Sequence, residues 1–425
     1  MSSLSISAAA PSPELLELPW SVPLEDWPDD TIAALPKGIS RHVVRFVHLG
    51  GHVVAVKETT EDLARREYDM LRTLGKLQVP CVEPVAIVSG RVSAKGEDLA
   101  PALVTRHLQY SLPYRALYSK TLRPDTATRL ADALALLLVR LHLVGFFWGD
   151  VSLSNTLFRR DAGAFAAYLV DAETGDLHPE GLSEGQREHD LEIARVNVAG
   201  ELFDLQSGGR LDDDIDPIEV THGIVESYRK LWTELTGWES FDSSERWRIT
   251  DRVKQLNDLG FDIEELTMSS DAGGTTLSIQ PKVVDAGHHQ RRLLRLTGID
   301  AGENQARRLL NDLDSYRATR FPDGGVDEEV VAHDWLTRVF EPVIRAIPRE
   351  LRGKLEQAEL FFQLLEHRQG RSEREGRDVS LAEALSSYVD EILQHRRDES
   401  QVMNPPTQAL TALNPTGEID WRDLV

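Results

Sequence analysis

Cysteine is almost absent from this chain of 425 residues, which contains only Cys81. A single thiol forms neither an intramolecular disulfide nor a cluster of thiolate metal ligands, so we expect a protein of the reducing cytoplasm. An uninterrupted apolar run of membrane-spanning length is also missing, because the most apolar stretch, 130–149, contains Asp132, Arg140 and His142. We therefore predict a buried helix there and no membrane span.

Basic residues are scarce relative to acidic ones: 47 Lys and Arg face 70 Asp and Glu, giving a formal charge of -23. Such a surface repels phosphate backbones, which disfavours nucleic acid as a partner. Hydrophobic residues make up 41% of the chain and charged residues 28%, the proportions of a folded globular protein. The length exceeds what one hydrophobic core supports, so we expect more than one domain.

The first hundred residues predict a small antiparallel sheet with one helix. Two Val-rich strands are expected within 41–58, around a turn at Gly50-Gly51, and residues 61–77 have helical periodicity. Two further strands are predicted at 82–88 and 100–108. Residues 1–18 are rich in Ser, Ala and Pro and lack the pattern of a signal peptide, so we expect a flexible tail.

The rest of the chain is predicted to be mainly helical. A long helix over 124–145 is followed by a loop at 148–155 and a strand at 167–171. Residues 260–285 are polar and contain Gly273-Gly274, which indicates a strand pair or a linker. Further helices are expected at 186–205, 217–236, 244–258, 288–297, 302–319, 328–346, 350–367 and 379–396.

Lys57 and Glu67 form the first chemical pair. Lys57 ends the strand tetrapeptide Val-Ala-Val-Lys, in which Ala55 leaves space for an adenine ring and the lysine reaches nucleotide phosphates. Glu67 shares a helical face with Leu63 and Leu71, so it should be buried and need a cation. A solvated strand lysine is the alternative, but the two residues together predict an ion pair.

Asp150, Asn155 and Asp171 form the second group. Asp150 and Asn155 lie five residues apart in the loop after the long helix, and Asp171 ends the next strand. This spacing is typical of a loop in which the aspartate orients a substrate hydroxyl while the asparagine binds a metal ion. Asn155 and Asp171 offer the oxygen ligands that Mg²⁺ prefers. An Asp and an Asn this far apart are also common in ordinary turns, so the order of all the motifs carries the argument.

This ordered set resembles the atypical branch of the protein-kinase-like superfamily, with the lipopolysaccharide-core kinases, aminoglycoside phosphotransferases and RIO kinases. The segments LHLVGFFWGDVSLSNTLF and LVDAE resemble its catalytic loop and metal segment over about residues 40 to 240. The whole chain also resembles an actinobacterial family of unknown function with a helical C-terminal half. The resemblance implies an α+β fold of two kinase-like lobes followed by an α-helical domain. Its expected parts are a tail at 1–18, an N-lobe at 19–109, a C-lobe at 110–258, a helical domain at 259–396 and a tail at 397–425.

The implied activity is transfer of the γ-phosphoryl group of ATP, with Mg²⁺, to a hydroxyl of an unidentified sugar, small molecule or protein. Asp150 would be catalytic, and Lys57, Glu67 and Ala55 would bind the nucleotide. No complete glycine-rich motif precedes Lys57, so Gly50 and Gly51 are the residues expected to cover the phosphates. Asn155 and Asp171 would be the metal ligands.

Departures from the family pattern keep a second interpretation open. Trp148 replaces the usual histidine before Gly-Asp, and Ala172 replaces the residue that usually follows the metal aspartate. A pseudokinase that binds and regulates is the alternative function. Asp190 is either a residue that braces the catalytic loop or an ordinary acidic helix cap.

The C-terminal half offers fewer motifs. Residues 291–313 fit either a DNA-binding helix-turn-helix or a packed helical hairpin, and the acidic chain favours the hairpin. His288 and His289 have no convincing companions for zinc. The helical domain is therefore a candidate surface for a protein partner.

Overall fold

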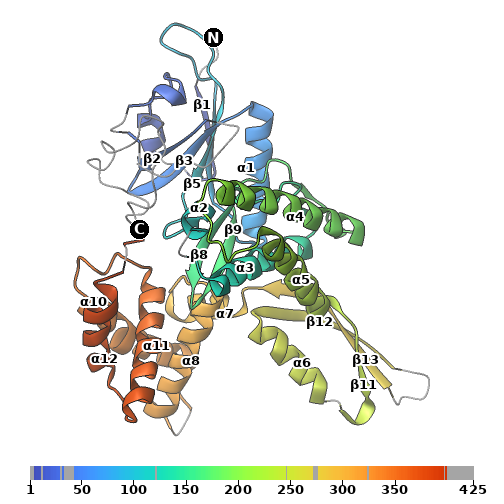
Figure 1. Cartoon of the computed structure of the whole chain (residues 1–425), viewed down its shortest axis with the longest axis vertical. Coiled ribbons are helices and arrows are strands. Elements are labelled where there is room, and N and C mark those ends of the chain that lie inside the picture. The colour runs from blue at the N-terminus through green and yellow to red at the C-terminus, as the bar shows by residue number, and fades with distance from the viewer. Residues whose placement is uncertain are drawn as a thin grey trace. The chain divides into compact units, whose positions relative to one another are not determined.

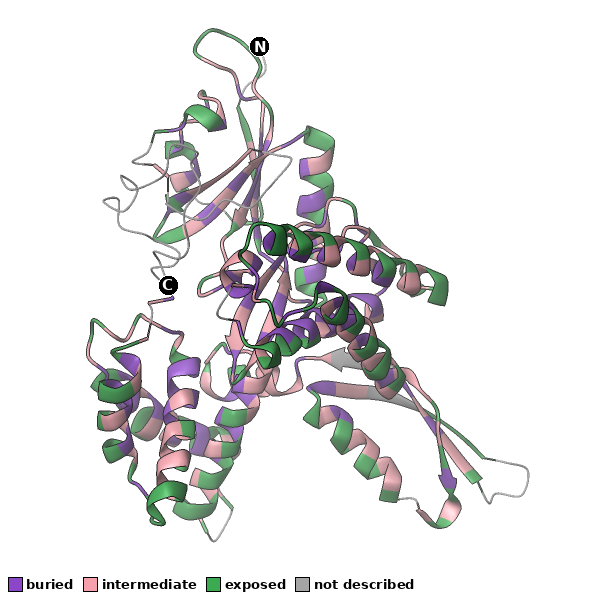
Figure 2. Cartoon of the chain, viewed as in Figure 1, coloured by how far each residue is buried: buried purple, intermediate pink, exposed green. Residues whose placement is uncertain are grey.

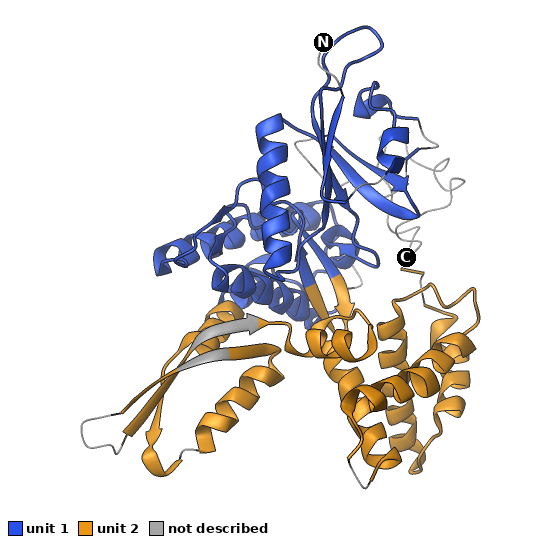
Figure 3. Ribbon diagram, turned by 180° about the vertical axis from the view of Figure 1, so that it is seen from behind, with its two compact units in different colours: residues 1–158, 167–225, 400–425 blue, residues 159–166, 226–399 orange. Residues whose placement is uncertain are grey.

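The chain forms two compact units, which are described separately. The computed structural model describes residues 4–10, 13–28, 31–32, 43–119, 122–245, 247–270, 276–322, 325–396 and 398–399, without the side chains of 264–266 and 282–285. The first unit comprises the described parts of 1–158 and 167–225, and the second comprises 159–166 and 226–399 (Figures 1 and 3). The lobe and domain boundaries expected from the sequence stay predictions.

A five-stranded antiparallel sheet forms the N-terminal part of the first unit. Its order is β1-β4-β5-β3-β2. The two faces of β3 differ, since Val54 and Val56 are buried in one core while Val53, Ala55 and Lys57 lie on the other face. The strands are β1 (Ser5–Ala8), β2 (Val44–Leu49), β3 (His52–Glu58), β4 (Pro84–Ser89) and β5 (Ala102–Arg106).

The N-terminal segment belongs to this sheet, so the predicted flexible tail at 1–18 is wrong over its described residues. Strand β1 pairs with β4, from Ser5 opposite Ser89 to Ala8 opposite Ala86. Short 3-10 turns at Pro13–Glu17 and Leu24–Asp26 follow. The apolar side chains of this segment cover the sheet because their burial removes them from water. They are Leu15, Leu18, Trp20, Leu24 and Trp27.

Arg91 ties the N-terminal segment to the sheet. Its guanidinium is only 1% exposed and donates to the carbonyls of Trp20 at 3.2 Å and Val22 at 2.8 Å. It also pairs with Glu58 at 2.8 Å. The Glu58 carboxylate accepts the backbone N–H of Leu24 at 3.1 Å. A buried charge needs such partners, and here they come from both the segment and the sheet.

Helix α1 (Glu61–Lys76) packs on the sheet through Ala64 and Tyr68, which meet Ile87 and Leu103. Thr60 caps its start by accepting the N–H of Leu63. The remainder of the first unit holds α2 (Tyr114–Leu117), α3 (Pro124–Leu143), β6 (Leu112–Pro113), β7 (Phe146–Phe147), β10 (Asp176–Leu177) and α4 (Glu184–Ser207). Helix α3 is buried over most of its length, as Figure 2 shows, which confirms the predicted buried helix. No described helix is long and apolar enough to cross a membrane.

Three elements run through both units. Strands β8 (Thr156–Asp161) and β9 (Ala164–Leu169) are neighbours in the sheet β6-β8-β9, and their turn lies in the second unit. Helix α5 (Pro217–Thr236) likewise begins in the first unit and ends in the second.

The second unit is not wholly helical. A three-stranded antiparallel sheet, in the order β11-β13-β12, is formed by β11 (Glu239–Asp242), β12 (Phe261–Ser270) and β13 (Thr276–Ala286). Of the two alternatives for 260–285, the strand pair is therefore confirmed and the linker is wrong. Successive residues of β12 pair with β13, from Phe261 opposite Ala286 to Ser270 opposite Leu277, with two register shifts near Glu265. Helix α6 (Trp247–Asp258) precedes β12.

The helical part of the second unit has one hydrophobic core. It includes the apolar faces of α7 (His288–Thr297) and α8 (Glu303–Arg320), which confirms a packed hairpin. Arg291 and Arg292 pair with Asp262 and Glu328, so these arginines already have acidic partners. The other helices are α9 (Glu328–Trp335), α10 (Glu341–Ala346), α11 (Gln357–Glu375) and α12 (Leu381–Tyr388), with π turns at Leu336–Phe340 and Val389–Leu393.

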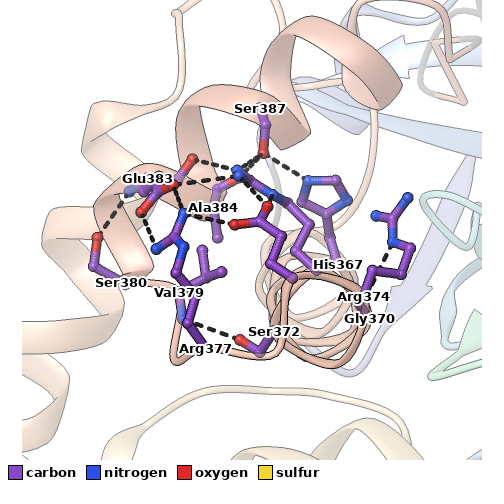
Figure 4. Close-up of polar contacts among 12 residues, drawn as sticks. His367, Gly370, Ser372, Arg374, Arg377, Val379, Ser380, Glu383, Ala384 and Ser387 are labelled. Carbon is purple, nitrogen blue, oxygen red and sulfur yellow. Dashed lines mark hydrogen bonds and ion pairs between the residues drawn. The ribbon is translucent and has the colours of Figure 1, made fainter.

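An ion-pair network joins α11 to α12 (Figure 4). Arg371 and Arg377 both contact the carboxylates of Glu375 and Glu383. Ser380 caps α12 by accepting the N–H of Glu383 at 3.3 Å. The arginines are neutralised within the network, so it offers no argument for an anion site. The predicted C-terminal tail at 397–425 lies outside the described residues except for 398–399.

Candidate active site

The Lys57 amine lies among three carboxylates of the first unit. Its Nζ is 3.1 Å from Glu67, 2.6 Å from Asp171 and 2.9 Å from Glu173. The predicted Lys57–Glu67 ion pair is confirmed, and Glu67 is buried at 2% exposure. Strand β3, helix α1 and the segment after β9 therefore bring their charged residues to one point.

Burial and mutual repulsion govern the charges of this cluster. The pKa of Glu67 is raised to about 8, first by burial and then by the Asp171 carboxylate, and Lys57 opposes both effects only in part. Burial by itself would lower the pKa of Lys57, but Glu67 and Asp171 outweigh it, so the net direction is upward. Lys57 therefore stays a protonated ammonium, and Glu67 holds a proton more readily than a free glutamate does.

Asp150 and Asn155 lie in one hydrogen-bonded loop between β7 and β8. Asn155 Nδ2 donates to the backbone carbonyl of Asp150 at 3.1 Å and to its carboxylate at 3.0 Å. These bonds use the amide nitrogen and leave Oδ1 as the atom that could bind a cation. The predicted five-residue spacing thus brings the two side chains together.

Asp190 braces this loop and is not a helix cap. Its buried carboxylate accepts the backbone N–H groups of Trp148 at 2.7 Å and Gly149 at 2.8 Å, and lies 3.2 Å from His142 Nε2. The cap of α4 is Ser183, seven residues earlier. Burial lowers the pKa of His142, so the neutral ring donates its Nε2 hydrogen to the carboxylate. Gly149 has a φ of 75°, a conformation that favours glycine and turns both N–H groups toward Asp190.

Trp148 links the loop that contains Asp150 to the segment that contains Asp171. Its indole Nε1 donates to the backbone carbonyl of Asp171 at 2.9 Å, and its own carbonyl accepts from Thr174 Oγ1 at 2.9 Å. The ring is fully buried. The departure noted in the sequence therefore keeps an N–H donor at this position and adds a large apolar surface.

Gly50 and Gly51 do not lie near Lys57. They form the two-residue turn between β2 and β3, with φ of 56° and 81°. Lys57 lies near the other end of β3, where it pairs with Val44 of β2. From His52 to Lys57 the strand advances roughly 17 Å, at about 3.3 Å per residue. The position of this turn does not favour the expectation that these glycines cover the phosphates, and that expectation stays a prediction. Ala55 does share the Lys57 face, and its role beside adenine stays a prediction.

Three residues that contact the predicted site residues or their loop were not predicted from the sequence. Glu173 joins the Lys57 cluster and donates its N–H to Asp171 Oδ1 at 3.0 Å. Asn197 contacts the Asp150 carboxylate at 3.4 Å and the Val151 carbonyl at 3.1 Å. Glu201 accepts two backbone N–H groups of the loop, at 2.7 and 2.9 Å. The only sequence signal for the last two is their spacing by one helical turn in α4.

The donor set fits a hard divalent cation. Oxygens of Glu67, Asp171 and Glu173 lie within 4.8 Å of one another, and the Asn155 amide belongs to the adjoining loop. Carboxylate and amide oxygens are the ligands that Mg²⁺ takes in proteins. The Lys57 ammonium already contacts all three carboxyl groups, so a bound cation would share their oxygens with it.

Residues 52–196 match the model of the Lipopolysaccharide kinase (Kdo/WaaP) family. The resemblance to the atypical kinase-like superfamily is confirmed. Residues 230–393 match the model of a domain of unknown function, DUF4032. A solved structure described as WaaP in complex with acyl carrier protein is similar over 47% of this chain and 78% of that chain, with 16% identity and a TM-score of 0.33. A search of curated proteins gave no match.

The kinase-family match contains Lys57, Glu67, Asp150, Asn155 and Asp171, and it begins just after Gly51. It supports a kinase-like phosphotransferase, and the α+β fold agrees with the prediction.

Proposed function

We propose that the chain is an ATP- and Mg²⁺-dependent phosphotransferase that transfers the γ-phosphoryl group to a hydroxyl of its acceptor. The observation that carries this proposal is the Lys57 ammonium, held at 3.1 Å from Glu67 and 2.6 Å from Asp171. A phosphate-binding lysine needs a buried partner that fixes its direction, and phosphoryl transfer depends mainly on positioning and on charge neutralisation.

Each residue then has a distinct task. Lys57 would hold the phosphates of ATP, with Glu67 fixing its amine. Asn155 and Asp171 would hold Mg²⁺, which supplies charge neutralisation on the phosphates when bound. Asp150, fixed by Asn155 and Asn197, would orient the acceptor hydroxyl and accept its proton. The acceptor stays open among sugars, small molecules and proteins.

A binding or regulatory module of the pseudokinase type is the second candidate. It is favoured by the 2.6 and 2.9 Å contacts of Lys57 with Asp171 and Glu173, because phosphates must compete with these carboxylates for the amine. The Gly50-Gly51 turn adds to this case, because it lies at the end of β3 that is away from Lys57.

The deciding experiment compares wild type with Asp150→Ala, using labelled ATP and the cell's own extract. The enzyme interpretation expects nucleotide affinity within a few fold of wild type and transfer reduced about a hundredfold or more, the scale of a lost positioned base. Asp176→Ala is the control. Asp176 also lies in the first unit, but it is exposed and pairs with Arg66. A wild-type protein that binds Mg-ATP and labels no extract component would favour the binding module.

A further inference from the structure

The turn of the β8–β9 hairpin is held by the second unit through a buried polar network. Asp161 Oδ1 accepts the N–H of Gln305 at 2.8 Å, and Oδ2 accepts the N–H of Asn304 at 3.1 Å, so Asp161 caps α8 from outside that helix. Arg159 pairs with Glu356. Arg160 pairs with Glu399, at 2.5 Å. Asp161 is only 3% exposed, so its bonds to the start of α8 form away from solvent.

The turn itself is conformationally demanding. Ala162 and Gly163 form its two residues, with φ of 51° and 82°. An alanine in the left-handed region is strained, and such a conformation persists where its surroundings fix it. The N–H of Ala162 donates to Glu359 Oε2 at 3.2 Å, and Gln305 donates to the same carboxylate at 2.9 Å.

The backbone of Gly302 packs closely against the Asp161 carboxylate. A Cβ added to Gly302, the cap residue of α8, would lie 2.4 Å from Asp161 Oδ1. Real Cβ contacts do not come that close, so only glycine leaves room for this carboxylate at the start of α8.

The other end of the hairpin carries the proposed metal ligands. Asn155 directly precedes β8, and Asp171 follows β9 by two residues. The Val170 N–H donates to the Asn155 carbonyl at 3.0 Å, so the strands are still paired at that end. Six residues, or roughly 20 Å of paired strand, separate Asp161 from Asn155.

We propose that the second unit positions Asn155 and Asp171 by holding the β8–β9 turn, with Asp161 as the positioning residue. This inference rests on the proposed function, because it concerns the spacing of the Mg²⁺ ligands. A ladder fixed at its turn keeps its two strands in register, and the register sets how Asn155 and Asp171 face each other.

The test measures hydrogen exchange and Mg²⁺ dependence in the full chain. Asp161→Ala is expected to speed amide exchange at 156–158 and 167–169, and to raise several-fold the Mg²⁺ concentration that gives half of the thermal stabilisation by ATP. Ser380→Ala is the matched control, because it also removes a helix cap in the second unit without touching the hairpin. If Asp161→Ala does not fold, Arg159→Ala carries the same test.

The outcomes separate the two proposals. Faster exchange that stays within 159–166 and α8, with an unchanged Mg²⁺ requirement, would overturn the positioning role while leaving the proposed function intact. An equal shift in Ser380→Ala would also overturn it, since loss of stability alone would then explain the effect. If ATP with Mg²⁺ does not stabilise wild type, the proposed function fails, and the exchange pattern alone decides whether the turn controls the strand ends.

Discussion

Asp190→Ala should be among the most destabilising single changes in the first unit. The Asp190 carboxylate is fully buried and accepts three donors: the backbone N–H groups of Trp148 and Gly149, and the His142 ring. Alanine leaves all three buried donors without this acceptor. At about 1–2 kcal/mol for each, the free energy of unfolding should fall by roughly 3–6 kcal/mol.

Urea unfolding, followed by tryptophan fluorescence, measures this loss. Trp148 is buried in the same loop, so unfolding of this loop should change its fluorescence. Asp190→Asn keeps the shape and one acceptor oxygen, and it should lose roughly half as much. Asp204→Ala, at an exposed position of the same helix, is the control, and its free energy of unfolding should fall by less than about 0.5 kcal/mol. A loss below about 1 kcal/mol for Asp190→Ala would refute the bracing role.

Three further predictions concern the Lys57 cluster and its neighbours. Trp148→Phe removes the indole donor to the Asp171 carbonyl, so it should reduce the thermal stabilisation by Mg-ATP, and Trp148→His should reduce it less. Equal thermal shifts in the two variants would show that this hydrogen bond does not affect the stabilisation. Because the pKa of Glu67 is raised, the folded state holds a proton that the unfolded state has lost, so stability should fall as pH rises from 4.5 to about 8 and then level off. Glu67→Gln should flatten that fall in urea titrations, and a parallel profile would contradict the raised pKa. Asp171→Asn should reduce stabilisation by Mg-ATP more than Asp150→Asn does, as differential scanning fluorimetry can measure; equal reductions would disfavour the assigned roles.

Local periodicity was sufficient to predict the centre of the site. The alternation of β3 placed Lys57 and Ala55 on one face, and the period of α1 placed Glu67 toward the sheet, so their ion pair followed from neighbouring elements. The five-residue loop spacing likewise brought Asp150 and Asn155 together.

Long-range pairing set the limits of that prediction. The Gly50-Gly51 turn was recognised correctly, but its distance from Lys57 depends on the register and length of β3. The N-terminal segment has no regular apolar period, and Leu15 and Trp20 become buried only because a sheet formed far along the chain needs cover. Asn197 reaches Asp150 from a helix that begins 34 residues after it, which no local pattern indicates.

The buried Arg91 has a practical consequence for preparing the protein. Shortening the chain to remove residues before Trp27 would take away two carbonyl acceptors of the guanidinium and uncover the apolar face of the sheet. The remaining protein would expose the valines of that face to water, and an exposed apolar patch promotes aggregation. Expression trials should therefore keep this segment intact and place purification tags elsewhere.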